Sequence, residues 1–197
     1  LSSVACWYSA ASQPNGDSIP VLSPSTNEVA TMPDILTHVL VGYILGTLLS
    51  SRYDWLTPEY VTLVMLGALT PDLTKIALLL PSERVELFLG VPFDWFALHT
   101  LGGNLAVLLL GALLVAPESR KRVFVLLALG AASHHSLDLL LFNPSGYSYP
   151  VLFPLTAYNP PAGQLYLSSD RWPALVAGAL AVLVWWARRS NANQKRA

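Results

Sequence analysis

The segment RVFVLLALGAASHHSLDLLLF, residues 122–142, decides the fold class of this chain. It is an almost uninterrupted apolar run, and its length matches the roughly 20 residues that a helix needs to cross a bilayer. His134 and Asp138 stand four positions apart in its last third, and side chains with that spacing lie on one face of a helix. The segment therefore predicts a membrane-spanning helix that carries a polar pair inside the lipid.

Four further apolar stretches occur in the chain, separated by polar breaks. They are residues 35–50, 60–80, 96–116 and 172–187. Residues 143–172 are rich in Pro and aromatic side chains, and they predict a structured loop rather than a span. We therefore expect an all-α, polytopic helical membrane protein with about five transmembrane helices.

The composition agrees with this expectation. Hydrophobic residues make up 53% of the 197 positions and charged residues only 12%, whereas a soluble domain carries roughly 25% charged residues. These values exclude a disordered chain and an ordinary water-soluble enzyme. The net charge of −1 provides no basic stripe for nucleic acid. We expect no nucleic-acid partner, and the lipid bilayer is the expected surrounding.

The basic residues are distributed unevenly over the breaks. One set of breaks, together with the tail, holds eight of them: Arg52, Arg120, Lys121, Arg122, Arg188, Arg189, Lys195 and Arg196. The other breaks hold only Arg84 and Arg171. Because loops rich in Lys and Arg stay in the cytoplasm, we expect the C-terminus inside and, with five spans, the N-terminus outside. The expected location is the cell (plasma or inner) membrane, crossed several times.

Three regions follow from these patterns. Residues 1–31 are rich in Ser, Pro, Asn and Thr and lack Lys and Arg, which predicts a disordered leader. Met32 stands directly before the first apolar stretch and is a candidate for the true start of the chain. Residues 32–189 form the predicted helical membrane domain, and residues 190–197 form a basic cytoplasmic tail.

Ionisable side chains inside the apolar stretches are candidates for function, because each is expensive to place in lipid. The candidates are His38, Asp72, His99, His134 and Asp138. In the expected topology all five fall in the outer half of the bilayer, although they come from four different stretches. Chance placement of polar residues would not concentrate them at one depth, so the pattern indicates a shared site.

Two local motifs sharpen this hypothesis. The i, i+4 spacing of His134 and Asp138 suits two ligands of one metal, or a carboxylate that orients a ligating imidazole. His135 points about 100° away around the same helix, so the sequence argument leaves it out of the site.

Pro71 interrupts the second stretch. Proline removes the hydrogen bond to the carbonyl four residues earlier, that of Gly67, and the break presents Asp72 to a cavity. In lipid such a break is tolerated only where protein or trapped water covers it. Lys75, one turn further on, either neutralises Asp72 or extends towards the membrane surface, and the sequence does not decide between the two.

Two other interpretations remain open. In a non-catalytic membrane protein, the same side chains hold helices together or form a structural or degenerate metal site. As a proton or ion pathway, they would need polar partners on both sides of the membrane midplane, and the expected cytoplasmic half is nearly bare.

The order of motifs resembles a known family. The motifs are His38 with Gly42, Pro71-Asp72, His99-Thr100, His134-x-x-x-Asp138, Tyr149-Pro150 and Phe153-Pro154. In this order they resemble the membrane-bound metal-dependent hydrolases, a family described as LexA-regulated and associated with the inner membrane. The resemblance covers about residues 32–188. That family is in turn similar in motif order to zinc-dependent phospholipase C and P1-type nucleases, which are all-α enzymes.

The resemblance implies a metal-dependent hydrolase. By this likeness the metal ligands are His38, Asp72, His99, His134 and Asp138, with Asp72 or Asp138 as the catalytic base. Imidazole and carboxylate ligands favour zinc among divalent metals. The implied reaction is attack of a metal-activated water on a phosphoester, and the depth of the site suggests a lipid or lipid-linked phosphate as substrate.

The chain departs from the family pattern at two places. Thr74 occupies the position where the family usually has a second acid after Pro71-Asp72. The third motif, residues 99–104, lacks the Arg and the further His that usually accompany it. With four histidines in the whole chain, a three-metal site cannot be assembled, and one or two metals are expected.

Overall fold

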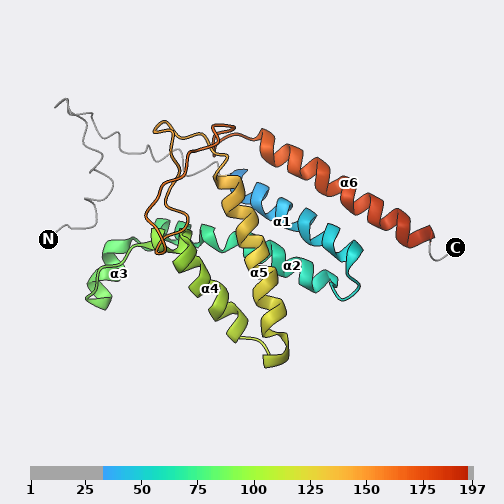
Figure 1. Cartoon of the computed structure of the whole chain (residues 1–197), viewed down its shortest axis with the longest axis horizontal. Helices are drawn as coiled ribbons and strands as arrows, with labels where there is room; N and C mark the ends of the chain where they lie inside the picture. Colours follow the sequence, from blue (N-terminus) through green and yellow to red (C-terminus); the bar gives the residue numbers. More distant parts are fainter. Residues whose placement is uncertain (1–32, 195–197) are drawn as a thin grey trace. The chain divides into compact units, whose positions relative to one another are not determined.

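The computed structural model describes residues 33–194, with side chains from 35 to 190 (Figure 1). The predicted leader at 1–31 and the last three residues of the predicted tail lie outside this range. The helical elements are α1 (Pro33–Arg52), α2 (Pro58–Leu69), η2 (Pro71–Leu78), α3 (Ser82–Leu89), η3 (Trp95–His99), α4 (Leu101–Leu113), α5 (Pro117–Asp138) and α6 (Trp172–Gln194). Residues 33–194 contain no β-strand beyond isolated bridges, so the all-α prediction is confirmed.

Each predicted apolar stretch contains a helix, but the helices in the second and third stretches are shorter than the stretches themselves. The second stretch is divided into α2 and η2, which are bent by 56° at the break before Pro71. The third begins as the short 3-10 helix η3, so that α4 keeps only 13 residues. Helix α3 was not predicted, and it ends at Gly90, whose φ of 69° lies in the left-handed region that glycine adopts without strain.

The membrane topology is only partly supported by helix length. By length and composition, one described helix can cross a bilayer, at Ile35–Arg52, and α2 with η2 adds a second if the bent pair counts as one span. Helix α4 is apolar but only about 20 Å long, and α5 carries three consecutive basic residues near its start. The predicted five-span topology is therefore not confirmed.

Helix α2 lies between α1 and α5 and packs extensively against both (Figure 1). Glycines bring the α2 and α5 backbones into direct contact. A Cβ added to Gly67 of α2 would collide with the carbonyl of Leu127, and one added to Gly130 of α5 would collide with the carbonyl of Val64. Small residues allow such close approach in membrane helices, where packing rather than water drives association.

The predicted structured loop follows α5. Two isolated bridges close it, Leu141 with Tyr166 and Tyr147 with Pro161. The same loop folds over the start of α4, where the N–H of Leu101 donates to the Val151 carbonyl at 2.8 Å. The first turn of a helix has unsatisfied N–H groups, and the loop supplies their acceptors. This docking brings the loop next to η3 and the end of α5.

The glycine contact between α2 and α5 makes a testable prediction. Replacement of Gly67 or Gly130 by Ala forces the two backbones apart, and we expect the thermal midpoint in detergent to fall by roughly 5 °C or more. Gly178→Ala is the matched control, because the nearest atom to its new methyl group is Leu40 Cδ1 at 3.9 Å. Circular dichroism on heating measures the effect. Equal midpoints for all three variants would contradict the close contact.

Candidate metal centre

The carboxylate of Asp138 is the centre of the polar cluster. It stands at the end of α5, and its side chain is only 4% exposed. His134, one turn earlier on the same helix, places Nε2 3.2 Å from Asp138 Oδ2. The i, i+4 pair expected from the sequence is thus formed on one helical face.

Two histidines from other elements complete the ring around this carboxylate. His38 of α1 is fully buried, and its Nε2 lies 3.3 Å from Asp138 Oδ1. His99 of η3 brings its Nε2 to 2.7 Å from Asp138 Oδ2. The rings of His38 and His134 stack with their centroids 3.7 Å apart. Three imidazoles from three elements therefore converge on one carboxylate.

Backbone carbonyls at the Pro71 break orient two of these rings. Nδ1–H of His134 donates to the carbonyl of Ala68 at 2.7 Å, and Nδ1–H of His99 donates to the carbonyl of Pro71 at 3.0 Å. A carbonyl oxygen only accepts, so Nδ1 carries the proton in both rings. Each Nε2 is then left to face Asp138, the arrangement by which a second partner usually orients a metal-binding histidine.

The broken end of α2 is held by polar side chains. Thr70 Oγ1 donates to the carbonyl of Gly67 at 2.8 Å, the acceptor that Pro71 leaves without its usual N–H. Buried Asn104 of α4 donates from Nδ2 to Thr70 Oγ1 at 3.1 Å. Thr74, at the position where the resembled family has an acid, donates to the Pro71 carbonyl at 3.3 Å. The Thr74 side chain therefore helps to stabilise the backbone after the break.

Asp72 lies beside this ring, at the start of η2. Its Oδ1 is 2.6 Å from Lys75 Nζ, which decides the alternative that the sequence left open: Lys75 neutralises Asp72. The second oxygen, Asp72 Oδ2, is buried and makes no hydrogen bond with the described residues. Asp72 therefore retains a free acceptor directed into the protein.

The structure adds two residues that the sequence argument did not place in the site. His135 Nδ1 lies 2.9 Å from the Tyr149 hydroxyl, which itself donates to Asp138 Oδ2 at 3.0 Å. The exclusion of His135 was wrong, because its ring extends from the flank of α5 towards His99, with centroids 5.8 Å apart. Tyr149 entered the sequence prediction only as part of the Tyr149-Pro150 motif, and no function in the site was assigned to it.

Three overlapping groups of side chains can hold a metal ion. They are His38, His134 and Asp138; Asp72, His99 and His134; and His99, His135 and Asp138. Within each group the candidate ligand atoms all lie within 4.8 Å of one another. The five predicted site residues all belong to these groups, and their roles as ligands or base stay predictions.

Residues 32–195 match the family described as YdjM inner membrane protein. This chain belongs to that family. The family description places the protein in the inner membrane and names no reaction. No curated protein and no solved structure matches the chain.

One edge of this cluster is more exposed than the rest. The His38, His134 and Asp138 side chains are between 0 and 4% exposed, whereas His99 is 14% and Lys75 26% exposed. Access therefore lies on the side of η2 and η3. A metal site with one accessible side can keep a coordination position for water or substrate, as catalytic sites do.

The Tyr149 hydroxyl provides a prediction for the metal centre. Tyr149→Phe removes the hydrogen bond to Asp138 and the partner of His135, so we expect the apparent affinity for Zn²⁺ to fall by roughly tenfold. Competition with a chromogenic chelator, on the full chain in detergent, measures it. Tyr158→Phe is the control, since Tyr158 is 62% exposed. Equal affinities in the two variants would remove Tyr149 from the site.

Proposed function

We propose that the protein is a multi-pass inner-membrane hydrolase that uses a divalent metal, zinc before others, to cleave a phosphoester in a lipid or lipid-linked substrate. The observation that carries the proposal is the convergence of three imidazole Nε2 atoms on the Asp138 carboxylate.

The protonation pattern supports a cation at this point. With Nδ1 protonated, a neutral His99 or His134 ring directs a lone pair at Asp138, which is repulsive at 2.7 to 3.2 Å. A second proton on a ring relieves the repulsion, but one carboxylate balances only one cationic ring. A divalent ion shared by the rings and Asp138 balances all of them together, and imidazole with carboxylate is a ligand set that suits zinc.

The residues divide into holding and reacting groups. His38, His99, His134 and Asp138 would hold the ion, and Tyr149 fixes the Asp138 carboxylate. A bound divalent cation supplies a Lewis acid that activates water and stabilises negative charge on phosphate oxygens. Asp138 is occupied by its imidazole and tyrosine contacts, so Asp72 is the better candidate for the base. Its Oδ2 has no hydrogen-bond partner among the described residues.

The more exposed edge suits a phosphate attached to an apolar group. Lys75, next to Asp72, offers a positive charge to a phosphate oxygen. Around it, the large side chains Ile76, Leu78 and Leu79 of the η2 region are exposed, Leu79 at 87%. Exposed apolar side chains close in sequence to a lysine suit a lipid phosphate that enters from the bilayer.

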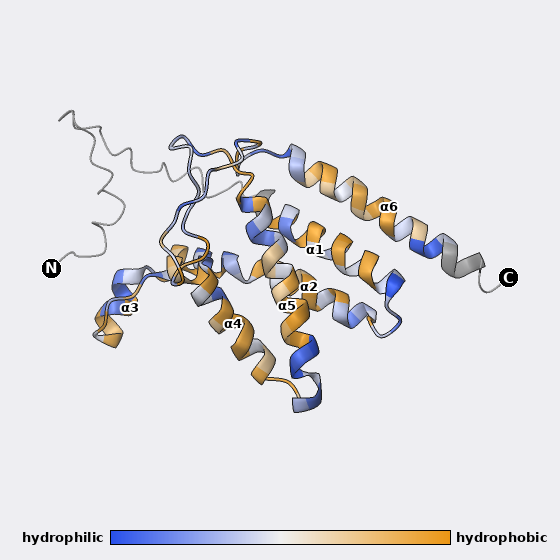
Figure 2. Ribbon diagram, viewed as in Figure 1, coloured by the Kyte–Doolittle hydropathy of each residue, from blue (hydrophilic) through white to orange (hydrophobic). Residues whose placement is uncertain are grey.

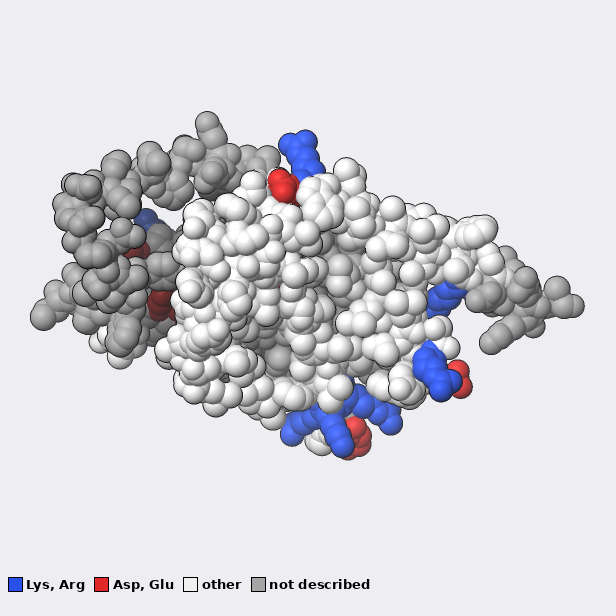
Figure 3. Space-filling view, turned by 45° about the horizontal axis from the view of Figure 1, so that its top comes forward, with Lys and Arg blue, Asp and Glu red and all other residues white. Residues whose placement is uncertain are grey.

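A multi-pass topology is supported by the distribution of charge and apolar surface. The Arg122 guanidinium at the start of α5 lies 5.8 Å from the ring centroid of Trp55 in the α1–α2 turn, so these two basic breaks meet. Figure 3 shows Lys and Arg at the margins of a broad uncharged face. Apolar side chains are exposed along α4 and α6, which Figure 2 shows as mostly hydrophobic.

The site and the basic end are separated along α1. His38 stands fourteen residues before Arg52, a rise of about 21 Å along a helix. With the basic end in the cytoplasm, the proposed centre lies in the outer half of the membrane.

The first test is metal content and hydrolysis. We expect the purified wild-type chain to retain close to one or two zinc ions and to cleave a chromogenic phosphodiester in mixed micelles. His134→Ala should lose at least about tenfold in metal affinity. Asp72→Asn should lose at least about a hundredfold in rate.

Asp54→Asn, in the exposed α1–α2 turn, is the matched acid control and should keep both properties. A wild-type chain without metal would overturn the proposal. A chain that binds metal but hydrolyses no phosphoester would favour a structural metal, the function that the full burial of His38 and His134 otherwise supports.

The topology has a separate test. A phosphatase reporter that is active only outside the cytoplasm should be inactive when fused after Ala197 and active when inserted after Ser145, in the loop beyond α5. Activity at both positions, or only at the C-terminus, would contradict the proposed orientation.

A further inference from the structure

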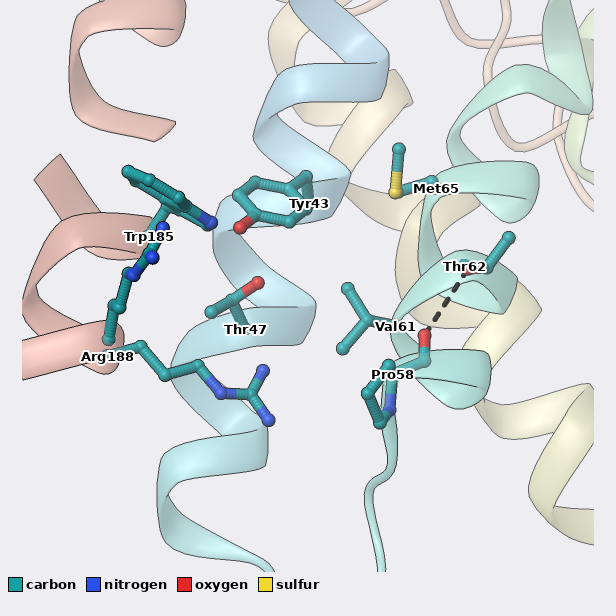
Figure 4. A pocket seen from close by; sticks show the side chains of 9 residues that line it. Tyr43, Thr47, Pro58, Val61, Thr62, Met65, Trp185 and Arg188 are labelled. Atoms are coloured by element: carbon teal, nitrogen blue, oxygen red, sulfur yellow. Dashed lines mark hydrogen bonds between the residues drawn. The ribbon is translucent and has the colours of Figure 1, made fainter. Parts of the chain in front are cut away.

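A groove at the opposite end of the helices from the metal centre lies between α1, α2 and α6 (Figure 4). Its volume is about 580 Å³, within the roughly 300–1,000 Å³ of typical ligand pockets. Its walls include Tyr43 and Thr47 of α1, Val61 and Met65 of α2, and Arg188 and Arg189 of α6. The groove therefore combines an apolar wall with two cations.

Thr47 supplies a polar group to this groove that the protein does not use. The residue is 2% exposed, and its hydroxyl makes no hydrogen bond within the described residues. A threonine inside a helix ordinarily donates to a backbone carbonyl three or four residues earlier. Figure 4 shows the Thr47 side chain on α1, below the Tyr43 ring and above the Arg188 side chain. A buried hydroxyl without a partner among the described residues is available to donate a hydrogen bond to a group bound in the groove.

The two arginines also lack an acidic partner within the part of the chain whose side chains are described. No carboxylate among residues 35–190 lies within 4.0 Å of the Arg188 or Arg189 guanidinium. Arg189 is positioned over the ring of Trp185, with its Cζ 5.4 Å from the ring centroid. Stacking of this kind fixes a guanidinium while its N–H groups stay available for an anion.

We propose that this groove binds an anionic phospholipid. The headgroup phosphate accepts hydrogen bonds from Arg188, Arg189 and the Thr47 hydroxyl, and an acyl chain follows the apolar wall formed by Val61 and Met65. Arginine pairs phosphate oxygens through parallel N–H groups, and basic pockets between membrane helices commonly hold acidic headgroups.

The position of the groove favours a lipid over a free anion. One of its walls is α6, on which the large apolar side chains Val182, Leu183 and Trp186, outside the groove lining, are between 58 and 63% exposed. A soluble phosphate would leave the apolar part of the groove unfilled, whereas a phospholipid fills both parts. The proposal is independent of the metal centre, since Thr47 stands nine residues, or about 14 Å, beyond His38 along α1.

Native mass spectrometry of the full chain in detergent tests the proposal. With phosphatidylglycerol added, we expect one tightly retained lipid per chain, and with the same concentration of phosphatidylcholine a retention at least roughly tenfold weaker. The double variant Arg188→Gln/Arg189→Gln should lose roughly tenfold or more in affinity for phosphatidylglycerol. Thr47→Val, which keeps the shape of the side chain, should lose roughly threefold and should leave the arginines in place.

Arg52→Gln/Lys121→Gln is the matched control. It removes the same charge from two exposed positions that do not line the groove, and it should change phosphatidylglycerol affinity less than about twofold. Equal losses in the two double variants would overturn the proposal in favour of general charge attraction. It would also be overturned by equal retention of the two lipids or by displacement with millimolar inorganic phosphate. If the arginine variant does not fold, an unchanged affinity in Thr47→Val contradicts the proposal.

Discussion

The break in α2 before Pro71 is the constraint on which the centre of this protein depends. In a continuous helix each carbonyl accepts from the N–H four residues later, which leaves few carbonyls for side chains of other elements. Here the 56° bend leaves the carbonyls of Ala68 and Pro71 on either side of the break to accept from His134 and His99. These two hydrogen bonds fix which nitrogen of each ring faces Asp138, so backbone geometry determines the chemistry that the cluster can perform.

The break can serve the site only because α5 approaches it so closely. At Gly67 and Gly130 the two helices meet backbone to backbone, and any Cβ there would collide with a carbonyl. The approach sets His134 within 2.7 Å of the Ala68 carbonyl. Thr70 and Asn104 hold the bent end from the α4 side, and the loop after α5 brings Tyr149 to Asp138. The close packing of α2 against α5 therefore also positions the side chains of the cluster, and a larger side chain at Gly67 or Gly130 would disturb both.

The two polar regions of the protein differ in their electrostatics. The cluster around Asp138 brings imidazole nitrogens and carboxylate oxygens together, and this set of side chains can hold a cation. The groove beside Arg188 and Arg189 holds two cations with no carboxylate of residues 35–190 within 4.0 Å, so an anion is its proposed ligand. Helix α1 contributes to both regions, and His38 of the cluster and Thr47 of the groove stand nine residues apart along it, a rise of about 14 Å or roughly half of a bilayer's hydrocarbon depth.

The sequence by itself determined the all-α class, the helical stretches, the break at Pro71 and the residues His38, Asp72, His99, His134 and Asp138 as a group. Hydrophobic periodicity, the effect of proline on a helix and the free-energy cost of a charge in lipid each depend on a short segment of the chain. They can therefore be predicted from the sequence. The tertiary structure alone decided the partners: the carbonyls of Ala68 and Pro71, the pairing of Lys75 with Asp72, and the entry of His135 through Tyr149. It also showed that the third stretch begins as η3, which shortens α4, and it gave the 56° bend between α2 and η2, so that the five stretches did not become five full-length helices. Apart from the Lys75–Asp72 pair within η2, these contacts join residues that are 14 to 66 positions apart. Their distances follow from how closely the helices pack, which spacing along one chain does not encode.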